Sequence, residues 1–163
     1  ESIRVLDVTD LKKVTHLIIP GGESTVISAF LDKTGIGSEI VRRVKEHSLS
    51  VLGTCAGAIL LATEVVPNEK ISLLGLIDIT IERNSYGRQA QSFEASIILE
   101  PTQKKFNAVF IRAPKIMEVR GDAKILATHE NNPILVQQNN VLVSTFHPEY
   151  LQHSFIHEYF LKQ

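Results

Sequence analysis

The sequence predicts an α/β fold in which helices alternate with strands along the first half of the chain and strands dominate the second half. Residues 16–19 form a short apolar run typical of buried parallel strands. Apolar residues at positions 36, 40, 41 and 44 fall at helical spacing. From about residue 76 the period of the apolar residues changes to two, which is typical of strands. The 163 residues are enough for a sizeable core, so we expect a single domain over residues 1–163.

In the first half, we expect strands over residues 3–8 and 16–19, then a glycine-rich turn and two helices, over residues 25–33 and 37–47. Ser24 is the expected N-cap of the first helix. The second helix is expected to turn Arg42, Arg43 and Lys45 outward, opposite its apolar face. A further strand is expected at Val51 and Leu52, followed by a turn and a helix over residues 58–62.

In the second half, the alternating pattern predicts strands over residues 76–81, 95–99, 108–111, 125–128, 135–137 and 141–146. A terminal helix is expected over residues 152–161. No internal repeat or low-complexity linker interrupts the chain. This half therefore predicts a strand-rich excursion from the α/β sheet.

The composition is that of an ordinary globular protein, with 44% hydrophobic and 21% charged residues and a formal net charge of -1. This charge gives no electrostatic case for nucleic acid or an anionic membrane as the main partner. No apolar run approaches the roughly 20 residues that cross a bilayer, and no signal-peptide pattern is present. We therefore expect a cytoplasmic protein that binds neither nucleic acid nor membrane.

The only cysteine, Cys55, lies between two glycines in the sequence Gly-Thr-Cys-Ala-Gly at residues 53–57. A single cysteine excludes an intrachain disulfide and a multi-cysteine metal site, and we expect no metal. A strand-prone run enters the motif and a helix-prone run leaves it, as in the tight turn that exposes a nucleophile. The dipole of the following helix favours a thiolate. The alternative is a buried cysteine that packs as a small hydrophobic residue.

A cysteine nucleophile needs a base, and the base needs a group that orients it. The best candidates are His147 and Glu149, which follow the strand predicted over residues 141–146. Residues two apart in extended chain point the same way, and Pro148 restricts the backbone between them. Glu149 is thus expected to hold one imidazole nitrogen while the other faces Cys55. The alternative for a histidine in this pattern is a structural or exposed role.

Acyl transfer also needs hydrogen-bond donors for the oxyanion. The amide after the nucleophile, that of Ala56, is one candidate. The second is the amide of Gly22, in the Pro-Gly-Gly-Glu-Ser turn that follows a neighbouring buried strand. The alternative for this glycine pair is a simple tight turn.

Two polar stretches follow predicted strands and carry arginines: Glu-Arg-Asn-Ser-Tyr-Gly-Arg-Gln at residues 82–89 and Phe-Ile-Arg-Ala-Pro at residues 110–114. Arg83 and Arg112 are able to pair with a substrate carboxylate. Surface salt bridging is the alternative for either arginine alone.

Taken together, five stretches resemble the glutaminase subunits of pyridoxal 5′-phosphate synthase, a family of class I (triad) glutamine amidotransferases. The resemblance runs from about residue 3 to the end of the chain. The stretches are Pro-Gly-Gly-Glu-Ser, Gly-Thr-Cys-Ala-Gly, the two arginine stretches, and Phe-His-Pro-Glu at residues 146–149. The Gly-Thr-Cys-Ala-Gly and His-Pro-Glu motifs indicate only the wider amidotransferase class, whereas the arginine stretches point to this family.

The resemblance implies a flavodoxin-like three-layer α/β/α sandwich and the hydrolysis of L-glutamine to glutamate and ammonia, without a cofactor. It makes Cys55 the nucleophile and completes the triad with His147 and Glu149. It also implies that ammonia passes to a (β/α)8-barrel synthase subunit, which activates the glutaminase by docking. Six residues fall on the family's glutamine-binding positions: Gly22, Glu23, Ser24, Arg83, Ile111 and Arg112.

The sequence departs from the family at its start, where a further strand and a Gln-Gly loop precede the segment that matches residues 3–8. Residue 1 is Glu and the only methionine is Met117, so we expect that the chain is N-terminally incomplete. Without that strand, the sheet is expected to expose an unpaired edge.

Three other functions fit parts of the pattern. One is a class I amidotransferase of another pathway, and another is a catalytically silent partner-binding subunit. The third, a stand-alone cysteine hydrolase or stress protein, fits the Cys55 turn but leaves the arginine stretches unexplained.

Overall fold

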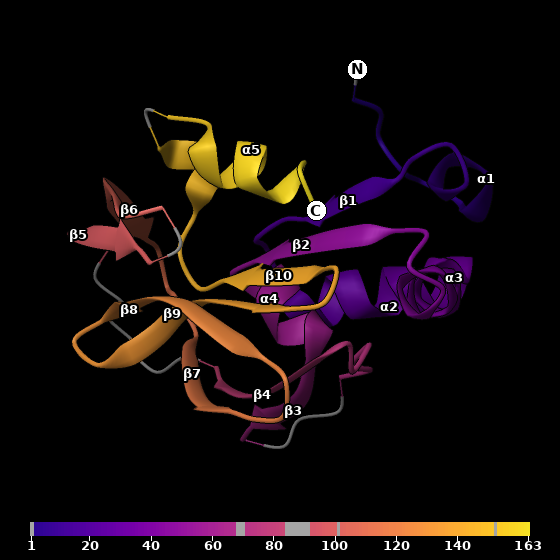
Figure 1. Ribbon diagram of the computed structural model, residues 1–163. Helices are drawn as coiled ribbons and strands as arrows, with labels where there is room; N and C mark the ends of the chain where they lie inside the picture. The colour runs from indigo at the N-terminus through magenta and orange to yellow at the C-terminus, as the bar shows by residue number, and fades with distance from the viewer. Residues whose placement is uncertain (1, 68–70, 84–91, 101, 152) are drawn as a thin grey trace.

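The computed structural model describes residues 2–67, 71–83, 92–100, 102–151 and 153–163 (Figure 1). In the first half, the elements are α1 (Val8–Leu11), β1 (His16–Ile19), α2 (Ser24–Thr34), α3 (Ile36–Lys45), β2 (Ser50–Thr54), α4 (Ala56–Leu61) and β3 (Ala62–Val66). In the second half, they are β4 (Ile77–Glu82), β5 (Phe93–Leu99), β6 (Lys104–Phe110), β7 (Lys115–Val119), β8 (Lys124–His129), β9 (Asn132–Gln138), β10 (Val141–Ser144), the 3-10 helix η1 (Pro148–Tyr150) and α5 (Phe155–Phe160).

The main sheet has the strand order β1-β2-β10-β9-β8 within the described residues. β2 lies between β1 and β10 and runs parallel to both, whereas β9 and β8 continue the sheet antiparallel. The carboxyl ends of β1, β2 and β10 therefore meet at one edge of the sheet. Ligands of α/β sheets bind at such an edge.

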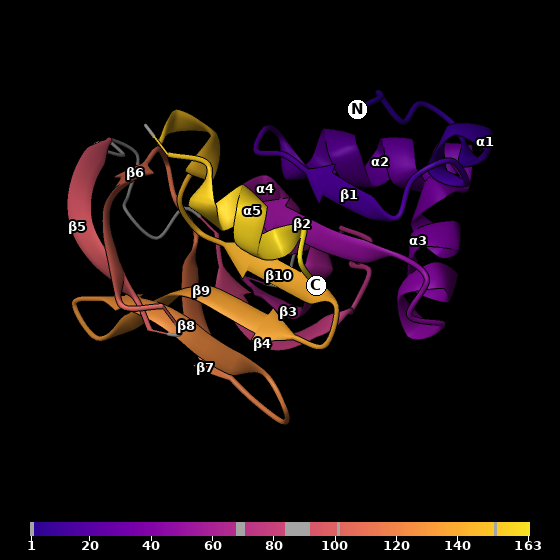
Figure 2. The ribbon, with the colours of Figure 1, turned by 45° about the horizontal axis from the view of Figure 1, so that its top comes forward.

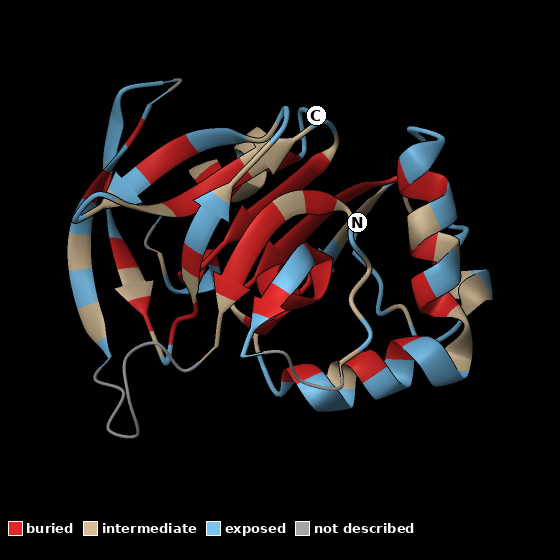
Figure 3. Ribbon diagram, turned by 90° about the horizontal axis from the view of Figure 1, so that it is seen from below, coloured by how far each residue is buried: buried red, intermediate tan, exposed pale blue. Residues whose placement is uncertain are grey.

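Helices cover both faces of the main sheet. Because successive residues of a strand point to opposite sides, neighbouring residues of β2 pack against different helices. Val51 packs in one hydrophobic cluster with residues of α2, α3 and α4, whereas Leu52 packs in a second cluster with residues of α5 and the β5–β6 hairpin. Figures 1 and 2 show α5 on one side of β2 and β10, and α2, α3 and α4 on the other. All residues of β2 and β10 are buried, as Figure 3 also shows for the centre of the molecule.

The strand-rich second half is confirmed: β8, β9 and β10 join the main sheet, and the other strands form two smaller sheets, one of them with β3, among the described residues. One has the order β3-β4-β7 and the other is the β5–β6 hairpin. All six strands expected in this half are present as β4, β5, β6, β8, β9 and β10. Strands β3 and β7 were not expected from the sequence pattern. The predicted terminal helix begins at Phe155 instead of residue 152, which lies outside the described residues.

The prediction of a strand over residues 3–8 is wrong. Residues 2–7 form no strand, and Val8 begins the short helix α1. The Asp7 side chain accepts a hydrogen bond from the Asp10 amide, and the Asp10 carboxylate accepts one from the Leu6 amide. These local bonds favour a helix start, and no described strand pairs with this segment.

The prediction that Ser24 is the N-cap is also wrong, because Glu23 caps α2 instead. The Glu23 carboxylate accepts a hydrogen bond from the Thr25 hydroxyl at 3.0 Å and one from the Thr25 amide at 3.5 Å. Ser24 is the first helical residue and is 2% exposed. The cap therefore lies one residue earlier than the sequence suggested.

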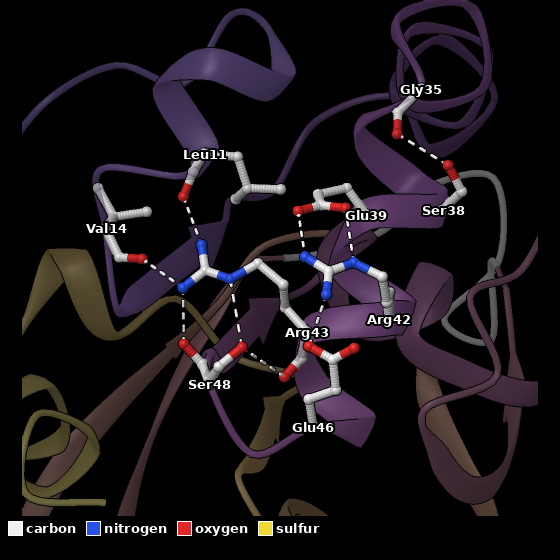
Figure 4. A network of polar contacts seen from close by, with 9 residues as sticks. All are labelled: Leu11, Val14, Gly35, Ser38, Glu39, Arg42, Arg43, Glu46 and Ser48. Carbon is white, nitrogen blue, oxygen red and sulfur yellow. Dashed lines mark hydrogen bonds and ion pairs between the residues drawn. The ribbon is translucent and has the colours of Figure 1, made fainter.

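The predicted outward direction of Arg43 on α3 is wrong as well, since this residue is 8% exposed. Its guanidinium donates to the carbonyl oxygens of Leu11 at 2.6 Å, Val14 at 2.9 Å and Ser48 at 2.6 Å (Figure 4). Arg42 does point outward and pairs with Glu39 of the same helix and with Glu46 at its C-cap. Arg43 thus joins the segments that lead into β1 and β2.

Candidate active site

The Cys55 turn joins β2 directly to α4, as the sequence predicted. Cys55 has φ 50° and ψ −103°, a conformation that non-glycine residues rarely adopt and that costs about 1–3 kcal/mol. Its amide donates a 2.8 Å hydrogen bond to the Ser144 carbonyl at the end of β10. The turn therefore holds the half-buried thiol at the carboxyl edge of the sheet.

The two glycines of the turn allow α4 to pack against the sheet. A Cβ atom on Gly57 would lie 2.0 Å from the Ile19 carbonyl oxygen, and one on Gly53 would lie 2.6 Å from the Gly57 backbone. Neither position has room for a side chain, so the close packing of β1, β2 and α4 depends on both glycines. This packing fixes the direction in which the Cys55 side chain leaves the turn.

His147 and Glu149 lie together just beyond the end of β10, as the sequence predicted. His147 Nδ1 is 2.7 Å from Glu149 Oε1. The His147 amide donates a 2.9 Å hydrogen bond to the Val109 carbonyl, which attaches this segment to β6. Pro148 begins the 3-10 helix that brings the glutamate back toward the imidazole.

Cys55 and Glu149 both favour the protonated imidazole of His147. The hydrogen bond with the Cys55 sulfur has the largest effect and that with Glu149 the next, and together they raise the pKa of His147 to about 10. Partial burial would by itself raise the pKa of Glu149, but the His147 hydrogen bond and nearby positive charge, including that of His157, hold this pKa below its ordinary value. The arrangement favours an imidazolium between the Cys55 sulfur and the Glu149 carboxylate.

The Cys55 side chain faces a cavity of about 460 Å³, and its sulfur lies 3.9 Å from the Ile111 carbonyl oxygen. Eight other predicted site residues line the same cavity, and Glu149 lies behind the imidazole. The eight are Gly22, Glu23, Ser24, Ala56, Arg83, Ile111, Arg112 and His147. The expectation that these residues gather at one site agrees with this geometry. Residues 84–89 of the first arginine stretch lie outside the described residues.

Charged side chains of both signs line the cavity. The Arg83 guanidinium is 3.4 Å from the Glu23 carboxylate, and the Arg83 side chain is 13% exposed whereas that of Glu23 is 60% exposed. Arg112 also lines the cavity and has φ 46°. An α-amino acid, with one carboxylate and one ammonium group, matches this pair of charges.

The sequence interpretation missed three residues near the site. Ile59 lines the cavity from α4, one helical turn after Cys55, and this spacing could have identified it. Pro114 also lines the cavity, at the end of the Phe-Ile-Arg-Ala-Pro stretch. His157 influences Glu149 from α5, and no sequence signal connects these two residues.

Within the described part of the chain, no group of three or more His, Cys, Asp or Glu side chains is arranged to hold a metal ion. None of the helices in this part is long and apolar enough to span a membrane.

The relatives of this chain among known proteins agree with one another. The model of the SNO glutamine amidotransferase family matches residues 1–163. A pyridoxal 5′-phosphate synthase subunit PdxT from Thermosipho africanus is 47% identical over 152 residues, covering 93% of this chain and 80% of the relative. The PdxT subunit from Pseudothermotoga lettingae is 46% identical over 162 residues, covering 99% and 83% respectively.

Solved structures agree with the fold. A crystal structure of a glutamine amidotransferase has a TM-score of 0.92 and 42% identity, covering 97% of this chain and 83% of that one. A glutamine amidotransferase from Thermotoga maritima has a TM-score of 0.57 and 10% identity, covering 85% of this chain and 58% of that one, and shows the fold alone. The predicted class I amidotransferase fold is confirmed.

Proposed function

Because the chain belongs to the SNO glutamine amidotransferase family, we propose that it hydrolyses L-glutamine to glutamate and ammonia and delivers the ammonia for pyridoxal 5′-phosphate synthesis. The observation that carries this proposal is the placement of Cys55, His147 and Glu149 beside one cavity. Its volume of about 460 Å³ lies within the range of about 300–1,000 Å³ common for small-molecule sites. We assign the whole chain, residues 1–163, to one glutaminase domain.

The charges at the cavity support recognition of the α-amino acid end of glutamine. Arg83 and Arg112 are assigned to the α-carboxylate, and Glu23 to the α-ammonium group. Ile111 and the backbone of Gly22 and Ser24 complete the binding residues. The side-chain amide then extends toward the sulfur of Cys55.

In the first half of the reaction, the Cys55 thiolate attacks the side-chain carbonyl carbon and a carbon–sulfur bond forms. His147 gives its proton to the amide nitrogen, the carbon–nitrogen bond breaks, and ammonia leaves. The raised pKa of His147 supports a starting state in which the imidazole already carries this proton. Glu149 keeps the ring oriented throughout.

In the second half, neutral His147 takes a proton from water, and the water oxygen attacks the thioester carbon. The carbon–sulfur bond breaks, so glutamate leaves and the thiolate and imidazolium are restored. The amides of Ala56 and Gly22 are assigned to the oxyanion in both halves. Ala56 opens α4, where backbone amides have no intrahelical acceptor. Every step uses side chains of this chain and water, so we assign no cofactor.

The partner is a synthase subunit, as the names of the relatives imply for those proteins. We further propose that this partner is a (β/α)8 barrel, that its docking raises glutaminase activity, and that the complex is cytoplasmic.

The test is to assay glutamate and ammonia release from L-glutamine with and without the synthase subunit, for the wild type and Cys55→Ala. We expect turnover by the wild type in the complex and none above background for Cys55→Ala. Equal rates for the two proteins would overturn the assignment of Cys55. Absence of turnover by the wild type in the complex would overturn the proposed function.

A further inference from the structure

Gly21 lies against the imidazole of His147, on the side of the ring that faces β1 and the turn after it. A Cβ atom on Gly21 would be 2.7 Å from His147 Cε1 and 3.4 Å from Nδ1. It would also be 3.5 Å from the Cβ of Cys55, which is ordinary contact. A methyl group here would therefore collide with the imidazole edge and fit against the cysteine.

The backbone gives no other reason for a glycine at this position. Gly22, the next residue, has φ 149°, a conformation that favours glycine. Gly21 is not among the residues with positive φ, so an L side chain is compatible with its backbone conformation. Only the space occupied by the imidazole excludes a side chain from Gly21.

The imidazole cannot move aside without losing its other contacts. Its Nδ1 is 2.7 Å from the Glu149 carboxylate, and interaction with the Cys55 sulfur stabilises its protonated form. The backbone amide of His147 is held by the Val109 carbonyl at 2.9 Å. A methyl group on Gly21 that pushed Cε1 away would change the geometry toward both Glu149 and Cys55.

We propose that Gly21 is a positioning residue, whose bare Cα leaves the space in which the His147 imidazole lies between Cys55 and Glu149. This inference rests on the proposed glutaminase function, and it assigns Gly21 a role separate from that of the neighbouring Gly22. Gly21 touches no reacting atom in this account and acts through His147.

The kinetic test compares Gly21→Ala with the wild type in the complex with the synthase subunit. We expect kcat to fall by about tenfold to a hundredfold, because small displacements of a catalytic group have effects of this size, with little change in the KM for glutamine. The matched control is Gly37→Ala, since Gly37 lies on α3 and the atoms nearest to its added Cβ would be those of Leu74 and Leu31, at 3.3–3.5 Å. The control should keep wild-type kcat. An active wild type with unchanged kcat in Gly21→Ala would overturn this inference and leave the glutaminase function intact.

A double-mutant cycle separates the contact from general damage to the fold. The thermal midpoint is measured for the wild type, Gly21→Ala, His147→Ala and the double variant. We expect Gly21→Ala to lower the midpoint when His147 is present and to have little effect when residue 147 is alanine. If Gly21→Ala alone did not fold but the double variant did, this would be the extreme form of the same result. Equal lowering in both backgrounds, or failure of both Gly21→Ala proteins to fold, would show that the methyl group meets something other than the imidazole and would overturn the proposal.

Discussion

The Nδ1 atom of His147 lies 2.7 Å from Oε1 of Glu149, across a single proline. This contact occupies one nitrogen of the ring and leaves the other for the Cys55 side of the site. Both residues lie in the segment that follows β10, the strand beside β2 in the parallel part of the sheet. The sheet therefore brings a base from one strand end to a nucleophile from the next.

The first prediction concerns the titration of His147. We expect NMR to show its pKa well above the ordinary value of 6.5, near 10, because the Cys55 sulfur and the Glu149 carboxylate both stabilise the imidazolium. Cys55→Ala should lower this pKa most, and Glu149→Gln should lower it less, following the order of the two effects. A wild-type titration near 6.5 would contradict the stabilisation of the imidazolium by the Cys55 sulfur and the Glu149 carboxylate.

The second prediction concerns the two supporting members of the triad. His147→Asn should lose most glutaminase activity, because it removes the group that carries the proton, by roughly a hundredfold or more. Glu149→Gln should lose less, since an amide oxygen still orients the ring. Steady-state kcat in the complex measures both effects. Greater loss in Glu149→Gln than in His147→Asn would argue against a purely orienting role for the glutamate.

The third prediction concerns substrate recognition by Arg83. Arg83→Ala should raise the KM for glutamine by roughly tenfold to a hundredfold, because a charged hydrogen bond contributes about 1.5–3 kcal/mol. The effect on kcat should be smaller. The matched control is Arg120→Ala, since Arg120 bonds to Asp78 and Glu118 and does not line the cavity. An unchanged KM in Arg83→Ala would remove this residue from the binding site.

The fourth prediction concerns the buried guanidinium of Arg43. Arg43→Ala should lower the free energy of unfolding by about 1–3 kcal/mol, because it removes the buried donor to the Leu11 carbonyl and the partly buried donors to the Val14 and Ser48 carbonyls. Urea denaturation measures the change. The neighbouring Arg42→Ala is the control and should alter stability little, since its ion pairs are exposed. Equal effects of the two substitutions would contradict the role assigned to Arg43.

The parts of the site that the sequence predicted are those in which a local motif fixes the geometry. The glycines around Cys55 and the single residue between His147 and Glu149 act over a few residues of chain. Their positions after apolar runs placed them at strand ends, and parallel strands end at the same edge. The arginine stretches could be placed at the cavity only through the family resemblance.

The errors arose where particular side-chain hydrogen bonds, either local or between distant segments, decide the structure. Residues 3–8 have a strand-like composition, but the Asp7 and Asp10 bonds direct the segment toward α1. Arg43 has the charge of a surface residue, but it is buried because three backbone carbonyls from other segments face it. The role inferred for Gly21 depends on the position of the His147 ring, which lies more than a hundred residues away in the sequence.

The most direct test of the central claim is covalent labelling by a glutamine-analogue electrophile, read by intact-protein and peptide mass spectrometry of the chain in complex with the synthase subunit. The account predicts one adduct per chain, located on Cys55, with a rate that L-glutamine lowers by competition. It also predicts no adduct on Cys55→Ala. Labelling that leaves Cys55 unmodified, or that L-glutamine does not slow, would contradict the assignment of Cys55 as the nucleophile that attacks glutamine.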